Sequence, residues 1–375
     1  MADSASQYLI ISCDGGGIRG LITALLLDQL SPSFLQQAYL FSGTSTGGII
    51  ALALASGIST SKLVQLYSND GAQIFTTSAC FGSSEAAGAA KVREAAASSA
   101  ASLGGIWDDL WQYLFDLVCV KYDNGGLQSV INSTLGGQAS ATIGSLDRNV
   151  MVTTLRLFNA KTNAWAPLMF HNIPNITDNP TAATKVIDAA MSTSAAPTYF
   201  PPYNHPVFGY CADGGVVANN PAVLAASMLI ESGIPREQIW MLSLSTGDTI
   251  NSYPPSLVGG VYGPSSYGPF FWLFPVAQDS AENGAQTYTP SMPLTSAVFD
   301  GVSDINDYMC SQILAPGQYV RANVPLNTPV ALDDYSQAAI TAMQDAVTDY
   351  VNEQGGEWAG ILNWISTNFP SGQSK

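Results

Sequence analysis

Histidine and basic side chains are scarce in this sequence. Its 375 residues include 2 histidines and 12 lysines and arginines against 28 aspartates and glutamates, which gives a net charge of −16. Such an excess of negative charge argues against nucleic-acid binding and against electrostatic anchoring to anionic membranes. So few histidines, and no acidic loop of the calcium-binding type, predict no zinc or calcium site, and we expect no cofactor.

Paired cysteines and long apolar runs are also missing. Five cysteines occur without paired spacing: Cys13, Cys80, Cys119, Cys211 and Cys310. This pattern predicts neither a disulfide framework nor a metal site, and Cys13 and Cys211 are expected on strands as small core residues. No transmembrane segment is predicted. No signal peptide is predicted either, because the first strand is expected to begin by Tyr8 and leaves no room for one. A cytoplasmic location is expected, with peripheral membrane attachment and export by a signal-less route left open.

What the sequence does contain is apolar material and glycine motifs. Ser45 lies in Gly43-Thr-Ser-Thr-Gly-Gly48, a G-x-S-x-G pattern between an apolar stretch at 38–41 and an apolar helical run at 49–55. A strand, a sharp turn and a helix are therefore expected, which is the setting that a nucleophilic serine requires. The helix start at Thr46 offers free N–H groups to an oxyanion. An ordinary glycine-rich turn is the alternative interpretation.

Two further glycine clusters accompany this serine. Asp213 lies in Ala212-Asp-Gly-Gly215, and Asp14-Gly-Gly-Gly-Ile-Arg-Gly20 follows a strand-like segment at 9–11. The second cluster also fits G-x-G-x-x-G, but a dinucleotide site needs an acidic residue about 20 positions on. None occurs between Asp28 and Asp70. Consecutive N–H groups in a glycine run suit a smaller anion, such as the oxyanion of acyl transfer.

Together these segments resemble the patatin-like lipid acyl hydrolases. The matching segments follow the family's order from about residue 7 to 350. They are 14–20, 43–48, Ser194-Ala-Ala-Pro-Thr-Tyr-Phe-Pro201, Asp213-Gly-Gly-Val-Val-Ala-Asn-Asn-Pro221, Leu242-Ser-Leu-Ser-Thr-Gly247, Tyr319-Val-Arg321 and Leu332-Asp-Asp-Tyr-Ser336. Ser245 stands where the family usually has a glycine. The resemblance implies a three-layer α/β/α fold with a central, mostly parallel sheet. It also implies one catalytic domain over 7–350, with an insertion at about 76–147 and a C-terminal extension at 351–375.

The same resemblance assigns roles to residues. Ser45 would be the nucleophile, Asp213 the base of a Ser–Asp dyad, and the oxyanion donors would be Gly15, Gly16, Gly17 and Thr46. The implied activity is hydrolysis of fatty acyl esters of phospholipids, galactolipids or glycerides, at a membrane or micelle surface. An acyltransferase or thioesterase with the same dyad, or a storage protein with residual esterase activity, remains an alternative.

The order of the two histidines supports a dyad independently. An α/β-hydrolase triad runs serine, acid, histidine, but His171 and His205 both precede Asp213. A triad of Ser45, Asp188 and His205 stays possible on order alone. His205 is expected in a loop because prolines surround it, and His171 is interpreted as a structural residue.

Several other segments have recognisable patterns. Residues 148–158 predict a strand, and apolar positions after Ser336 predict an amphipathic helix with that serine as N-cap. Trp107 and Trp111 begin an apolar stripe that ends at Val118, and Phe271 and Trp272 lie in an aromatic segment at 253–276. These four aromatic residues are candidate lipid contacts, while a packed helix and a covering loop are the plainer interpretations.

Overall fold

The structure is a computed structural model that describes residues 6–78, 120–248, 280–282, 285–287 and 293–370. The candidate lipid contacts Trp107, Trp111, Phe271 and Trp272 lie outside the described residues, as do the segments around them. No helix of the described part combines the length and the apolar character needed to cross a membrane.

The described core is built on one eight-stranded sheet with the order β10-β7-β1-β2-β3-β6-β5, and with β4 also paired to β3. From β10 to β3 every neighbouring pair is parallel, and the pairs of β3 with β4, β3 with β6 and β5 with β6 are antiparallel. The strands are β1 (Tyr8–Cys13), β2 (Ala38–Thr44), β3 (Asn149–Asn159), β4 (Ala164–His171), β5 (Tyr203–His205), β6 (Gly209–Asp213), β7 (Ile239–Leu244) and β10 (Tyr319–Ala322). A separate pair contains β8 (Ser280–Glu282) and β9 (Ala285–Thr287).

Helices cover both faces of this sheet, because its central strands bury side chains on both faces. Along β1, Leu9 and Ile11 belong to one buried apolar cluster and Ile10 to another, as the alternation of a strand requires. The first cluster includes side chains of α1 (Gly20–Asp28), α2 (Pro32–Leu35), α3 (Thr46–Ala55), α4 (Thr60–Asn69), α5 (Gly71–Ile74), α8 (Asn124–Leu135), α9 (Val186–Thr193), α15 (Gln337–Asn352) and α16 (Glu357–Asn368). The second includes side chains of α11 (Ala222–Glu231) and α14 (Pro293–Ile313).

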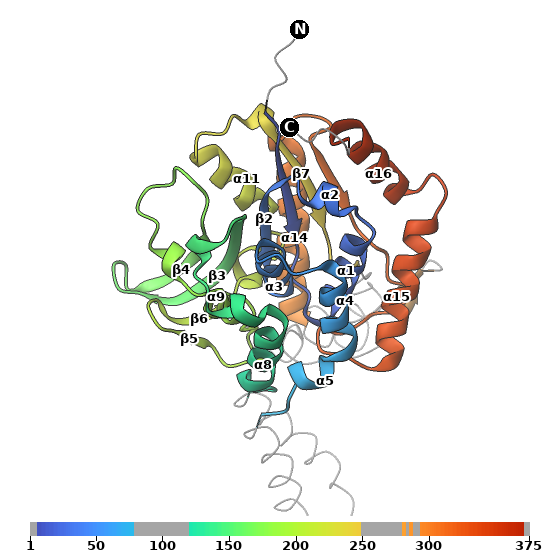
Figure 1. The fold of residues 1–375 in the computed structure, drawn as a ribbon. Coiled ribbons are helices and arrows are strands. Elements are labelled where there is room, and N and C mark those ends of the chain that lie inside the picture. Colours follow the sequence, from blue (N-terminus) through green and yellow to red (C-terminus); the bar gives the residue numbers. More distant parts are fainter. Residues whose placement is uncertain (1–5, 79–119, 249–279, 283–284, 288–292, 371–375) are drawn as a thin grey trace, which may run out of the picture.

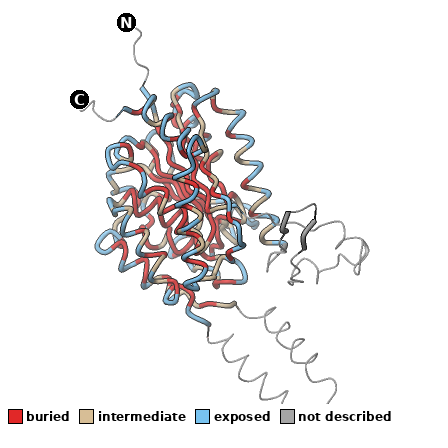
Figure 2. Tube along the Cα trace, turned by 90° about the vertical axis from the view of Figure 1, so that its right-hand side faces the viewer, coloured by how far each residue is buried: buried red, intermediate tan, exposed pale blue. Residues whose placement is uncertain are grey.

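The result is a layered α/β/α arrangement, as the resemblance implies (Figure 1). Figure 2 shows the buried residues concentrated in the middle of the molecule and the exposed ones on the outer helix surfaces. Short helical turns complete the described elements: α10 (Gly215–Ala218), η1 (Gly17–Arg19), η2 (Gly136–Ser140), η3 (Ile143–Ser145), η4 (Pro180–Ala183) and η5 (Arg236–Gln238).

The closing helices pack on the same core. α15 begins after Ser336, whose hydroxyl accepts a hydrogen bond from the Ala339 N–H, so the predicted N-cap is confirmed. The apolar residues predicted for this helix are buried at Ile340, Met343, Val347 and Tyr350. Trp358 of α16, in the segment 351–375, is also buried in the first cluster. The helix α8, in the segment 76–147, buries Leu127 and Ile131 there.

Candidate active site

Ser45 occupies the sharp turn between β2 and α3. Its backbone has φ 54° and ψ −123°, a conformation that costs free energy for a residue with a Cβ and is found at functional turns. The neighbouring glycines are required by space. A Cβ at Gly43 would collide with the backbone of Gly47, and a Cβ at Gly47 would collide with the Cys13 carbonyl. The predicted strand, turn and helix are therefore all present.

The strand β3 brings Asp213 to this turn. Along one edge of β3, Thr153 pairs with Thr44 of β2, and the next residue, Thr154, pairs with Asp213 of β6. The two partner strands share this edge because β4 occupies the other edge at both positions. The residue after Thr44 is Ser45, so the end of β2 and the end of β6 meet at the same place.

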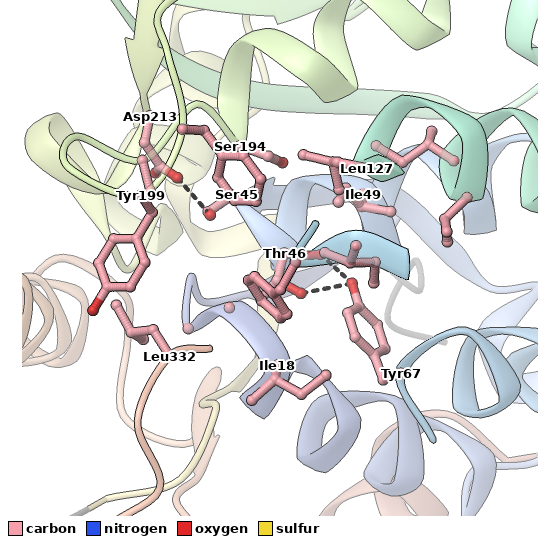
Figure 3. A pocket seen from close by; sticks show the side chains of 18 of the residues that line it. Ile18, Ser45, Thr46, Ile49, Tyr67, Leu127, Ser194, Tyr199, Asp213 and Leu332 are labelled. Atoms are coloured by element: carbon pink, nitrogen blue, oxygen red, sulfur yellow. Dashed lines mark hydrogen bonds between the residues drawn. The ribbon is translucent and has the colours of Figure 1, made fainter. Parts of the chain in front are cut away.

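Ser45 and Asp213 are directly hydrogen-bonded (Figure 3). The Ser45 hydroxyl donates to Asp213 Oδ2 at 2.6 Å, and the Gly215 N–H donates to Oδ1 at 2.6 Å. Asp213 is only 1% exposed, and this burial raises its pKa to about 7, an increase that the two hydrogen bonds partly oppose. The Ser45 N–H donates to Thr193 Oγ1 at 2.8 Å, which fixes the turn.

The glycine-rich loop after β1 lies beside the serine. A Cβ at Gly15 would stand close to the Ser45 Cβ and collide with Asn219, so only glycine fits. The Gly15 N–H donates to the Asn219 carbonyl at 3.0 Å, and the Ile18 N–H donates to the Leu332 carbonyl at 2.8 Å. Gly16 and Gly17 lie between these two residues, and their N–H groups have no hydrogen-bond acceptor within the described residues. These two groups are available to an incoming anion.

Thr46, the first residue of α3, is hydrogen-bonded to Tyr67 of α4. Its hydroxyl donates to Tyr67 Oη at 2.6 Å, and the Tyr67 hydroxyl donates to the Thr46 carbonyl at 3.1 Å (Figure 3). The N–H groups of Thr46 and its followers stand at a helix start, where intrahelical acceptors are lacking and the helix dipole is positive. The orientation of this helix start therefore depends on a tyrosine from another helix.

A largely apolar pocket opens at the dyad. Its lining includes Ser45, Asp213, Gly16, Gly17 and Thr46, and its walls come from α3, α4, α5 and α8 together with the segment 194–200. The wall residues include Leu66, Ile74, Phe75, Leu127, Ile131 and Phe200. Sequence reasoning missed them, although the spacing of Leu127, Val130 and Ile131 is the helical pattern that could have identified α8.

Neither histidine takes part in the site. His205 lies on the short strand β5 rather than in the predicted loop, because residues 203–205 pair with 209–211 of β6 despite the flanking prolines. Its Nδ1 accepts hydrogen bonds from the N–H groups of Val207 and Phe208. Asp188, its hypothetical triad partner, instead accepts a hydrogen bond from the Tyr203 hydroxyl at 2.6 Å.

His171 ends β4 in a hydrogen-bonded and mostly buried position, as a structural residue would. Its Nδ1 accepts a hydrogen bond from the Ile173 N–H at 3.3 Å, and burial lowers its pKa to about 4. Both cysteines predicted on strands are buried there: Cys13 is the last residue of β1, and Cys211 lies within β6. No three histidine, cysteine, aspartate or glutamate side chains form a potential metal site within the described ranges.

Comparison with known proteins identifies the family. The profile described as "Patatin-like phospholipase" matches residues 11–226, which contain Ser45, Asp213 and the glycine-rich loop. The chain belongs to the patatin-like phospholipase family. The resemblance read from the motifs and the α/β/α fold that it implies are thereby confirmed.

The sequence identity to individual members of the family is low. It is 29% identical over 269 residues to a cGAMP-activated phospholipase from Escherichia coli (strain TW11681), in an alignment covering 66% of this chain and 65% of the relative. It is 24% identical over 376 residues to Patatin-2-Kuras 4 from Solanum tuberosum, covering 90% of this chain and 84% of the relative. The match to the E. coli protein thus spans less than two thirds of that protein. Among solved structures, VipD from Legionella pneumophila is similar over 98% of this chain and 81% of its own, with 12% identity and a TM-score of 0.35.

Proposed function

We propose that this chain is a lipid acyl hydrolase that cleaves fatty acyl esters through Ser45 and Asp213. The observation that carries the proposal is the 2.6 Å hydrogen bond between these residues at the wall of an apolar pocket. A serine bonded to a buried base is a nucleophile ready for activation, and an apolar pocket beside it suits an alkyl chain. Membership of the patatin-like phospholipase family supports the same reaction class.

The reaction proceeds in two steps. Asp213 Oδ2 accepts the Ser45 proton while Ser45 Oγ attacks the ester carbonyl, and the proton then passes to the leaving alcohol. The acyl group remains on Ser45 until a water molecule, which gives its proton to the same carboxylate, attacks the acyl carbonyl. The bond to Ser45 Oγ then breaks, the proton on Asp213 passes to Ser45 Oγ, and the fatty acid is released. An aspartate with a pKa of about 7 is a better base than an exposed one, because burial reduces the difference between its pKa and that of the serine hydroxyl.

The carbonyl oxygen becomes negatively charged in both steps and requires hydrogen-bond donors. We assign this role to the N–H groups of Gly16, Gly17 and Thr46, at the glycine-rich loop and at the start of α3. Gly15, which the resemblance includes among the donors, is left out because its N–H donates to Asn219. Each well-placed donor contributes roughly 3–4 kcal/mol to transition-state stabilisation.

The proposed function is tested with the Ser45→Ala variant and a panel of phospholipids, galactolipids and glycerides, with products identified by mass spectrometry. Wild type should release free fatty acid from at least one class, and a fluorophosphonate probe should label Ser45. Ser133→Ala, at an exposed position of α8, is the matched control and should behave as wild type. Near-normal release by folded Ser45→Ala would refute the proposal. Transfer of the acyl chain to an added alcohol, in place of hydrolysis, would favour the acyltransferase alternative.

A further inference from the structure

The carboxylate of Asp333 joins two segments that lie far apart in the sequence. It accepts a hydrogen bond from the Tyr122 hydroxyl at 2.6 Å and forms an ion pair with the Lys121 ammonium group. The Asp333 side chain is only 10% exposed, whereas that of Lys121 is 45% exposed. The better shielded contact, and therefore the stronger constraint, is the one with Tyr122.

On one side, Asp333 is attached to the glycine-rich loop. Its neighbour Leu332 accepts the hydrogen bond from the Ile18 N–H through its carbonyl oxygen, at 2.8 Å. The same carbonyl stands against Gly17, which has φ +58° and no room for a Cβ. Leu332 also lines the pocket, beside Tyr199 in Figure 3. The position of Asp333 is therefore tied to that of the proposed oxyanion donors.

On the other side, Lys121 and Tyr122 hold one wall of the pocket. Their N–H groups donate to the carbonyls of Thr198 and Tyr199 at 3.0 and 2.7 Å. Thr198 has φ 74°, a strained conformation for a β-branched residue, which persists only where the surroundings impose it. The turn that it makes delivers Tyr199 and Phe200 to the pocket lining.

Aromatic rings continue this wall around the pocket. The Tyr122 ring lies 5.1 Å from that of Phe75 and 5.7 Å from that of Phe200, and the Phe75 and Phe200 rings are 6.0 Å apart. Phe75 and Phe200 both line the pocket, whereas Tyr122 packs behind them. Removing the Tyr122–Asp333 bond would weaken the link between this ring cluster and the glycine-rich loop.

We infer that Asp333 is a positioning residue that sets the acyl-chain selectivity of the pocket. It fixes the aromatic wall formed by Phe75, Tyr199 and Phe200 relative to Gly16 and Gly17, so that a long alkyl chain and the ester carbonyl fit at the same time. A short acyl group, held by the dyad and the oxyanion donors, does not need the wall. This inference rests on the proposed function, because it presupposes an acyl ester as the substrate.

The test compares kcat and KM for soluble p-nitrophenyl esters of increasing chain length in Asp333→Asn and Tyr122→Phe. Both changes keep side-chain size and weaken or remove the hydrogen bond. The ratio of kcat/KM for the long-chain ester to that for the butyrate ester should fall roughly 10-fold or more, because displacement of the wall by about 1 Å lowers catalytic efficiency strongly. The fall should arise from a higher KM for the long-chain ester. Asp334→Asn is the matched control, since the hydrogen bond that the Asp334 carboxylate accepts within the described residues comes from the Ser336 N–H and not from the pocket wall. It should keep the wild-type ratio.

The outcomes separate this inference from the proposed function. Butyrate hydrolysis by wild type that is lost in Ser45→Ala supports the dyad whatever Asp333 does. An unchanged chain-length ratio in both folded variants would overturn the role of Asp333. Equal losses on short and long esters would do so as well, because they would assign the contact to folding or to the oxyanion loop alone. If Asp333→Asn fails to fold, Tyr122→Phe decides the question.

Discussion

Tyr67 and Thr46 exchange two hydrogen bonds, at 2.6 and 3.1 Å, between α4 and the first residue of α3, the helix that follows Ser45. Both residues are buried, so the two hydrogen bonds are shielded from bulk water. We predict that Tyr67→Phe lowers kcat about 10-fold with little change in KM, and lowers the free energy of unfolding by about 1–3 kcal/mol, because two buried polar groups lose their partner. Steady-state kinetics and urea unfolding check both effects. Unchanged kcat in the folded variant would argue against Thr46 as an oxyanion donor.

The raised pKa of Asp213 leads us to predict that the proposed hydrolysis depends on pH. A base must be ionised to accept the Ser45 proton, and burial raises the pKa of this carboxyl to about 7. The value of kcat/KM for a soluble ester should therefore increase with pH and reach half of its maximum near pH 7. Hydrolysis in the presence of Ser45→Ala supplies the background rate. A rate that stays constant between about pH 5 and pH 9 would contradict Asp213 as the base.

The same pKa predicts a cost in stability. The folded-state pKa of about 7 is above the unfolded value of about 3.9, so the native state binds the proton more tightly. The resulting stabilisation is complete below about pH 4 and is lost as the pH rises through about 7. Relative to wild type, Asp213→Asn should therefore gain unfolding free energy between pH 4 and pH 8, although the proposed mechanism predicts that it is inactive. Urea titrations at both pH values measure this difference, which must depend on pH if the carboxylate causes it.

Much of the framework is predictable from the sequence because its signals are local. The apolar segments at 9–11 and 38–41 lie in β1 and β2, the strand predicted at 148–158 is β3, and the N-cap at Ser336 starts α15. The motifs around Ser45 and Asp213 require glycine at fixed positions, so both residues can be chosen as candidates without coordinates.

The remaining features depend on contacts between distant segments. Nothing near Tyr67 in the sequence indicates that it supports Thr46, and nothing near Gly15 indicates that Asn219 occupies its N–H. His205 becomes part of a strand because β6 pairs with it, which overrides the local preference of the prolines for a loop. Composition and periodicity carry no information of this kind.

The two histidines supply a test of the dyad against a triad. His205 packs on Phe170 and Phe208 at 5.3 and 4.9 Å, and its Nδ1 is occupied by two backbone N–H groups. We predict that His205→Ala destabilises the protein by about 1–3 kcal/mol through lost packing and hydrogen bonds. Its turnover per folded molecule should stay within about tenfold of wild type, because the proposed mechanism transfers no proton through an imidazole. His171→Ala should behave in the same way. A loss of several orders of magnitude in folded His205→Ala would restore the triad of Ser45, Asp188 and His205.

The glycine-rich loop leads to the most specific prediction about the oxyanion donors. A Cβ at Gly16 would collide with the Thr246 side chain, whose hydroxyl donates to the Gly15 carbonyl at 2.9 Å. Gly16→Ala must therefore displace the loop or the threonine, and we predict a loss of roughly 100-fold or more in kcat with a small effect on binding, as for a misplaced oxyanion donor. Gly137→Ala is the matched control, because a Cβ there meets no atom within 4 Å. Fluorophosphonate labelling of Ser45 should slow in parallel with kcat in Gly16→Ala, since the phosphoryl oxygen needs the same donors. Normal labelling with normal kcat would mean that the Gly16 N–H does not contact the reacting oxygen.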